Sequence, residues 1–205
     1  MTSIITGDII KSRQATNEDL WLQPLKAALS KLATDPNLYA IYRGDSFQIE
    51  CSTISDSFRY AVYIKACLKT IKNLDVRMAI GIGHKAYQGN SVSESNGEAF
   101  IYSGETFETL KKEKQNLKIK TKNEDLNKEI NLYFRLALIA MDHWTVNSAE
   151  IVKLSLEQPN MIQVELAKII GISQDAISKR QKRAYLDEII ALDQLYRQKI
   201  SPLCS

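Results

Sequence analysis

The stretch Tyr42-Arg43-Gly44-Asp45-Ser46-Phe47-Gln48-Ile49-Glu50 begins with a glycine and a carboxylate and then alternates polar and apolar side chains. Gly-Asp pairs are common in tight turns, and alternation with a period of two is typical of a strand with one buried face. Residues 38–42 are also strand-like. We therefore expect a β-hairpin with Gly44-Asp45 at or near its tip.

A second Gly-Asp pair, Gly7-Asp8, follows the apolar start of the chain. We expect a first strand over residues 3–6 and a chain that leaves the sheet at Gly7, so both pairs would lie at strand ends. If Asp8 and Asp45 meet, they form a two-carboxylate site suited to a divalent metal that holds a phosphate ligand. The alternative is that each pair is only a turn.

The other segments before residue 124 alternate between helix and strand patterns. Apolar periodicity predicts a helix over 55–73, a central strand over 76–83 and a helix over 97–114. Residues 85–96 indicate a loop or an irregular hairpin, and 117–122 an edge strand with lysines outward. Together they predict an α+β fold, in which helices cover a mostly antiparallel sheet as in a ferredoxin-like sandwich.

From residue 124 onward the pattern is helical only. We therefore predict an α+β domain over residues 1–123, a connecting helix over 124–143 and an all-α domain over 144–205. The last helix, over residues 185–199, carries a long apolar face. That face could close the small C-terminal core or pair with a second subunit.

Residues 161–183 form the strongest single motif. Two short helices are expected on either side of Gly171-Ile172-Ser173, with Ala167 small enough for close approach and Gly171 suited to the turn. Ser173 can cap the second helix, which then offers Gln174, Ser178, Lys179, Lys182 and Arg183 on its exposed face. Gln and Ser can contact base edges in the major groove, while Lys and Arg contact phosphates.

This segment resembles the helix-turn-helix of bacterial regulators and of the last domain of sigma factors. The match extends from Gln163-x-Glu165-Leu166-Ala167 through Gly171-Ile172-Ser173-Gln174 to Arg180. The resemblance implies binding of double-stranded DNA through the second helix. The residues expected to contact DNA are Ser173, Gln174, Ser178, Lys179, Arg180, Lys182 and Arg183. A helical hairpin whose basic face is merely solvated is the alternative.

The N-terminal part resembles the catalytic domain of class III nucleotide cyclases in Asp8-Ile9, Gly44-Asp45-Ser46-Phe47 and Arg77-Met78-Ala79-Ile80-Gly81-Ile82. The resemblance implies that Asp8 and Asp45 hold Mg²⁺ or Mn²⁺ against a nucleotide. Phosphate contacts would come from the backbone after Asp8 and from nearby side chains, namely Lys11, Ser12, Arg13 and Arg43.

The Asn and Arg that this family uses to stabilise its transition state have no counterpart in residues 97–105, and Glu105 stands where the arginine would fall. Loss of such a positive clamp lowers phosphoryl-transfer rates by several powers of ten. The chain also resembles, nearly end to end, the SatD-type family of small bacterial proteins, in its Arg-Gly-Asp-Ser-Phe hairpin, its Gly-Glu-Ala-Phe segment and its terminal helix-turn-helix. That resemblance implies an architecture rather than an activity.

Composition narrows the function classes. The formal net charge of +3 is too small to indicate nucleic-acid binding by itself, so any basic surface must be local. Cys51, Cys67 and Cys204 lack the spacing of a zinc site or a disulfide framework. Neither a signal peptide nor an apolar run long enough to span a bilayer is visible, so we expect a cytoplasmic protein without membrane contact.

Three functions are compatible with these patterns. The first is a homodimeric DNA-binding transcriptional regulator, whose cyclase-like N-terminal domain is a sensor or dimerisation module. The second is a metal-dependent nucleotide cyclase or other phosphoryl-transfer enzyme with a regulatory helix-turn-helix. The third is an adaptor that binds other proteins.

Overall fold

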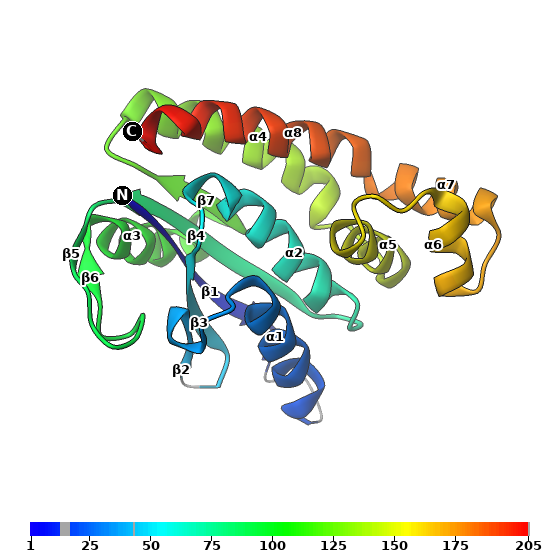
Figure 1. Cartoon of the computed structure of the whole chain (residues 1–205), viewed down its shortest axis with the longest axis horizontal. Coiled ribbons are helices and arrows are strands. Elements are labelled where there is room, and N and C mark those ends of the chain that lie inside the picture. Colours follow the sequence, from blue (N-terminus) through cyan, green and yellow to red (C-terminus); the bar gives the residue numbers. More distant parts are fainter. Residues whose placement is uncertain (13–16, 43, 205) are drawn as a thin grey trace.

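A computed structural model, which describes residues 1–12, 17–42 and 44–204, places five strands in one mixed sheet (Figure 1). The strand order is β2-β3-β1-β4-β7. All neighbouring strands are antiparallel except β4 and β7, which are parallel. The strands are β1 (Thr2–Ile10), β2 (Tyr39–Tyr42), β3 (Ser46–Cys51), β4 (Asp75–Gly83) and β7 (Leu117–Lys120). The predicted α+β class and the mostly antiparallel sheet are confirmed.

The hairpin prediction is also confirmed, because β2 and β3 pair antiparallel from Tyr39↔Ile49 to Tyr42↔Ser46. The prediction for Gly7-Asp8 is wrong. Strand β1 continues through Ile10, and its register with β4 runs without a break from Thr2↔Gly83 to Ile10↔Asp75.

Glycine is needed at position 7 for space rather than for a turn. A Cβ atom there would lie 2.6 Å from the Phe47 ring and 2.8 Å from the Arg77 carbonyl oxygen. A side chain on β1 would therefore collide with the buried ring of its β3 neighbour. Gly7 lets Phe47 pack across the strand.

Helices cover both faces of the sheet. On one face, α1 (Asp19–Leu32), α2 (Ser57–Lys69) and α4 (Glu124–Met141) share one apolar core with the sheet, in which Ile5, Phe47 and Ile80 are fully buried. On the other, α3 (Glu98–Glu113) packs on β1 and β4, where Thr6 Oγ1 lies 3.0 Å from Ser103 Oγ. The irregular hairpin expected over 85–96 is a small separate sheet of β5 (Lys85–Tyr87) and β6 (Asn96–Gly97).

The C-terminal part contains α5 (Val146–Glu157), α6 (Gln163–Ile170), α7 (Gln174–Ala184) and α8 (Leu186–Ile200). Helix α8 runs back along α4, while α6 and α7 form a protruding end of the molecule (Figure 1). The described part of the chain also contains the short 3₁₀ helices η2 (Pro36–Leu38), η3 (Ile54–Asp56) and η4 (Ser201–Cys204). Among the described helices, none is long and apolar enough to cross a membrane.

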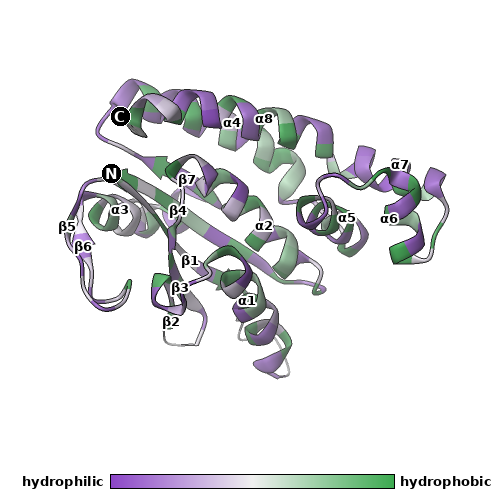
Figure 2. Ribbon diagram, in the orientation of Figure 1, coloured by the Kyte–Doolittle hydropathy of each residue, from purple (hydrophilic) through white to green (hydrophobic). Residues whose placement is uncertain are grey.

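The terminal helix α8 packs on the first part of the chain. The Tyr196 ring lies 5.7 Å from Phe58 of α2 and 5.9 Å from Phe134 of α4, and its hydroxyl lies 2.7 Å from Ser57 Oγ. In Figure 2 the ribbons of α2, α4 and α8 alternate between green, apolar segments and purple, polar segments. One hydrophobic cluster therefore extends from the sheet through α2 and α4 to α8.

A buried ion network also joins the sheet to the connecting helix. The Lys65 side chain on α2 is 1% exposed, and its ammonium lies 2.6 Å from Asp75 and 2.7 Å from Asp142. Lys69 reinforces it, since its ammonium donates to Asp75 Oδ2 at 3.0 Å and to the Asp142 carbonyl at 2.8 Å. The end of α4 is thus fixed to the start of β4.

Candidate functional site

The helix pair α6–α7 is formed by local signals at its three-residue turn. Gly171 adopts φ 77°, a left-handed conformation that favours glycine, and its N–H donates to the Ala167 carbonyl at 2.9 Å. Ser173 Oγ then accepts from the Ala176 N–H at 3.2 Å and caps α7. Leu166, Ala167 and Ile177 are buried where the helices meet. The two helices lie on either side of Gly171-Ile172-Ser173, as the sequence predicts.

Two contacts hold α7 on α5 and on the segment before it. The Arg180 guanidinium lies 2.6 Å from Glu150 of α5, and the Arg180 side chain is only 20% exposed. The Trp144 indole N–H donates to the carbonyl of Ala184 at 2.9 Å. Arg180, expected from the sequence among the DNA-contacting residues, is engaged in positioning the helix.

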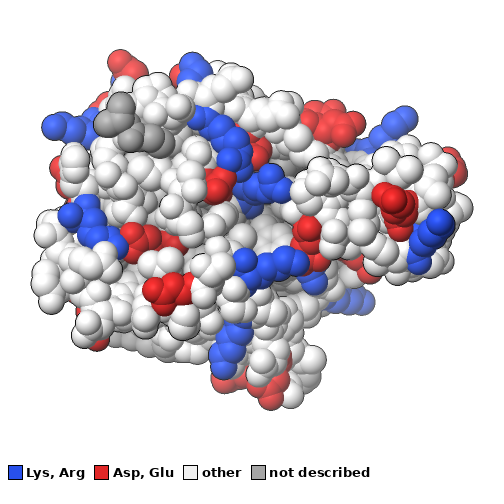
Figure 3. All heavy atoms as spheres, in the orientation of Figure 1, with Lys and Arg blue, Asp and Glu red and all other residues white. Residues whose placement is uncertain are grey.

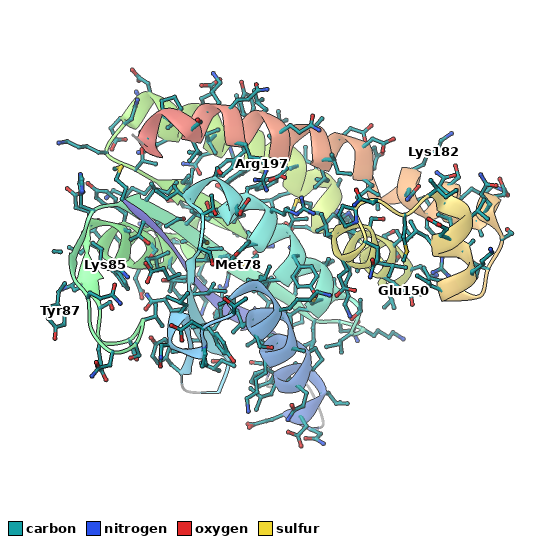
Figure 4. The ribbon with its side chains drawn as sticks, viewed as in Figure 1. Met78, Lys85, Tyr87, Glu150, Lys182 and Arg197 are labelled. Atoms are coloured by element: carbon teal, nitrogen blue, oxygen red, sulfur yellow. The ribbon has the colours of Figure 1, made fainter. Side chains whose placement is uncertain are left out.

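The other predicted DNA-contacting residues lie along the outer side of α7. Ser173, Gln174, Lys179, Lys182 and Arg183 are exposed, and Ser178 is half-buried. Lys179 pairs with Asp175 one turn earlier at 2.7 Å, both side chains being well exposed. Lys182 extends outward from α7 in Figure 4, and the protruding end carries both cationic and acidic groups in Figure 3.

The free cations of α7 are the groups best able to reach a polyanion. Neither Lys182 nor Arg183 has an ion-pair partner within the described part of the chain. Gln174 begins the helix, next to the capped N-terminus. A base-reading group and two phosphate-binding groups therefore share one exposed helix.

The two aspartates of the predicted metal site lie near the same end of the sheet. Asp8 is opposite Ser46 in the β1–β3 register, and Asp45 immediately precedes Ser46. Their carboxylates have different partners. Arg77 of β4 holds both oxygens of Asp8, with Nε 2.9 Å from Oδ1 and Nη2 2.5 Å from Oδ2. Ser12 Oγ donates to Asp45 Oδ2 at 2.8 Å.

Because Arg77 is bonded to Asp8, it determines whether a cation can bind at this site. Both oxygens of Asp8 are neutralised by a guanidinium, so a divalent metal would have to displace Arg77 before Asp8 could bind it. Within residues 1–12, 17–42 and 44–204, no group of three or more His, Cys, Asp or Glu side chains could hold a metal ion. The arrangement does not fit a preformed Mg²⁺ or Mn²⁺ site.

The predicted phosphate-binding residues follow β1. Lys11 is exposed and has a φ of 66°. Ser12 is buried, and its hydroxyl donates to the Asp45 carboxylate. Arg13 and Arg43 lie outside the described residues. On α3, Glu105 pairs with Lys120 of β7 at 2.8 Å, so this acid is neutralised by the edge strand.

Two residues that hold predicted site residues in place, Arg77 and Glu150, were not predicted from the sequence to have this role. Arg77 belongs to the apolar run 76–83, and its polar side chain in that run was the available signal. Glu150 gave no signal, because the contact with Arg180 is fixed only when α5 and α7 pack together.

Comparison with known families gives one match. The model of the SatD family matches residues 3–192. Among curated proteins and among solved structures, nothing matches this chain.

Proposed function

The chain belongs to the SatD family, and for this member we propose a DNA-binding transcriptional regulator whose N-terminal α+β domain senses a ligand and supports dimerisation. The observation that carries the proposal is α7. It follows a glycine turn, is capped by Ser173, is fixed by Arg180 to Glu150, and presents Gln174, Lys182 and Arg183 to solvent.

This arrangement suits the major groove for physical reasons. An α-helix fits the groove width, a glutamine near its N-terminus can pair with an adenine edge, and cations nearer its C-terminus can neutralise phosphates. The helix is held rigidly from behind by the Arg180–Glu150 pair and by Trp144. Ordering costs on binding are therefore small.

Fluorescence anisotropy with a labelled duplex tests the proposal. We expect Lys182→Ala/Arg183→Ala to weaken binding and to lower the slope of log K against log salt by about 1.8, since each lost phosphate contact removes about 0.9. Lys26→Ala/Lys128→Ala, which removes two exposed cations from α1 and α4, is the matched control for net charge.

Selection of genomic fragments by the wild-type protein then supplies a specific site. On that site Gln174→Ala should reduce discrimination between cognate and mutated duplexes. Equal affinity and equal salt slope for the α7 double variant and its control would exclude α7 as the DNA-binding helix.

The N-terminal sensor role is supported by the cluster at the end of β1. Asp45, Ser12 and the exposed Lys11 are close in the chain or joined by a hydrogen bond, and Asp8 is held by an arginine that a ligand could displace. A nucleotide, with or without Mg²⁺ or Mn²⁺, is the class of ligand that these groups suit.

The dimer role is supported by a second apolar stripe on α4. Leu132, Leu136 and Ile139 follow helical spacing on its outer side and are 45%, 57% and 68% exposed, although α4 already buries an opposite face in the core. A surface helix normally has one apolar face. Leu136 and Ile139 of the stripe, together with Leu192 and Leu195 of α8, border a groove of about 560 Å³.

A second copy of the chain is the occupant that the charges favour. Arg135 lies on the stripe and Glu188 on the α8 side of the groove, both exposed and without an ion-pair partner among the described residues. A two-fold interface would bring each Arg135 towards the Glu188 of the other copy, which makes the surface self-complementary.

Analytical ultracentrifugation tests this interface. Arg135→Glu and Glu188→Arg should each weaken dimerisation, and the double variant, which restores opposite charges across the two-fold axis, should recover it. A wild-type monomer at 100-fold the concentration used for DNA binding, or a double variant no better than the singles, would refute the arrangement.

A further inference from the structure

A second cavity, of about 280 Å³, lies where the α+β part meets the helices that carry α7. Its walls come from α2, the end of α5 and the loop after it, α6, α7 and α8. Much of the lining is apolar, including Val62, Leu156, Leu166, Leu186 and Ile189. Junctions between packed units are common places for small-molecule sites.

Polar groups of opposite charge share this cavity. Arg59 of α2 uses one guanidinium nitrogen to donate to the Leu156 carbonyl at 3.3 Å. Asp193 of α8 accepts from Arg197 Nε at 3.0 Å through Oδ2. Both residues line the cavity, yet within the described residues no hydrogen bond or ion pair joins Arg59 to Asp193.

Two buried oxygen atoms in the lining residues have no partner. Asp193 Oδ1 and Ser155 Oγ are both shielded from solvent and make no hydrogen bond within the described part of the chain. A buried acceptor without a donor costs about 1–3 kcal/mol, and more when it is charged. Neither atom is accessible to solvent, so the N–H donor of a ligand would reach it only after a shift of the side chain, and would then remove that cost.

The surroundings of Asp193 favour a cationic donor. Burial raises the pKa of the Asp193 carboxyl group above its ordinary value, although Arg197 and Arg59 act in the opposite direction. The negative charge is therefore incompletely stabilised by its present partners. An ammonium group placed beside it would be held by a charge-assisted hydrogen bond.

From this geometry we infer that the cavity binds a small zwitterion of the free amino-acid type. Its ammonium group would be bound by Asp193 and Ser155, and its carboxylate by Arg59. A volume of about 280 Å³ suits a molecule of this size, and the apolar lining favours an aliphatic side chain. A simple amine would make no contact with Arg59, and a simple acid would make none with Asp193.

The inference goes beyond the proposed function, because it adds a ligand site for a small zwitterion that is separate from the nucleotide site proposed at the end of β1. Arg59 belongs to α2 of the sheet domain, whereas Ser155 and Asp193 belong to helices on either side of α6–α7 in the chain. A ligand held by all three would stabilise one arrangement of α7 relative to the body. Its effect on DNA affinity rests on the proposed function, but its binding does not.

Isothermal titration calorimetry on the full-length wild-type protein tests binding directly. The twenty common L-amino acids are screened first, and L-leucine is then compared with 4-methylpentanoate, which lacks the ammonium group, and with isopentylamine, which lacks the carboxylate. We expect an aliphatic amino acid to bind and each charge-deleted analogue to bind at least tenfold more weakly. No heat from any amino acid at 10 mM, or equal binding of the analogues, overturns the inference.

Variants assign the residues. Asp193→Asn and Arg59→Gln should each weaken L-leucine binding at least tenfold, whereas Glu124→Gln, at the exposed start of α4 and outside this cavity, should not change it. The analogue comparison uses only wild-type protein, so it decides the question even if a variant fails to fold.

DNA binding is then measured with and without the amino acid. Amino-acid binding by a protein that binds no DNA would refute the proposed function and leave the inference standing. DNA binding without amino-acid binding would do the reverse.

Discussion

The buried Lys65 network makes a quantitative prediction about stability. Replacing Lys65 with Met keeps the length and apolar stem of the side chain but removes an ammonium that lies 2.6 Å from Asp75 and 2.7 Å from Asp142. Breaking a buried ion pair by removing one partner costs about 3–5 kcal/mol. Asp75 keeps Lys69 at 3.0 Å and Asp142 keeps the Asn116 amide at 3.0 Å, so the loss should lie near the lower end of that range, about 3 kcal/mol.

Urea unfolding, followed by tryptophan fluorescence, measures this loss as a lower midpoint at unchanged slope. Lys128→Met is the control, because the Lys128–Asp125 pair is 76% and 93% exposed and such pairs contribute about 0.2–1 kcal/mol at most. Neutralising Asp142 in Lys65→Met/Asp142→Asn should restore part of the stability, since Asp142 then carries no charge and Asp75 still pairs with Lys69 at 3.0 Å. A loss below about 1 kcal/mol for Lys65→Met would refute the claim that this network fixes α4 to β4.

Three further predictions follow from individual contacts. Gly7→Ala should lower the free energy of unfolding by about 1–3 kcal/mol, because its Cβ would lie 2.6 Å from the Phe47 ring. Gly104→Ala, whose Cβ would have nothing within 4 Å, should leave stability unchanged or raise it by up to about 1 kcal/mol. An equal shift of the urea midpoint in the two variants would contradict this prediction. Arg77→Gln should tighten Mn²⁺ binding measured by calorimetry, because it frees the Asp8 carboxylate beside Asp45; unchanged affinity would show that Asp8 is not a cation ligand. Burial raises the pKa of the Cys67 thiol to about 11 and that of Cys51 further, so in a Cys204→Ser background both should react slowly with a thiol reagent at pH 8 and faster as pH rises towards 11. Rapid reaction of the native protein at pH 8 would disprove their burial.

The sequence alone determined the features that depend on residues close together in the chain. Strand β4 and helix α3 were predicted from apolar periodicity, because burial of a face imposes a period of 2 or 3.6 on the chain. The connecting helix was predicted to begin at residue 124, and α4 does so because the Asn123 side chain accepts the N–H groups of Asp125 and Leu126. The turn between α6 and α7 was predicted from Gly171 and Ser173 for the same reason.

Only the tertiary structure decided which distant residues meet. Gly7-Asp8 has the composition of a turn, yet it lies within β1, because Phe47 of another strand needs the space above Gly7. Arg77 neutralises Asp8 because the β1–β4 register places them side by side, and this changes a candidate metal ligand into half of an ion pair. Register, helix packing and the burial of Lys65 depend on contacts between segments far apart in the chain. Local periodicity and capping residues contain no information on such contacts. The helices and strands could therefore be predicted from the sequence, whereas the residues that each of them contacts are determined by the fold.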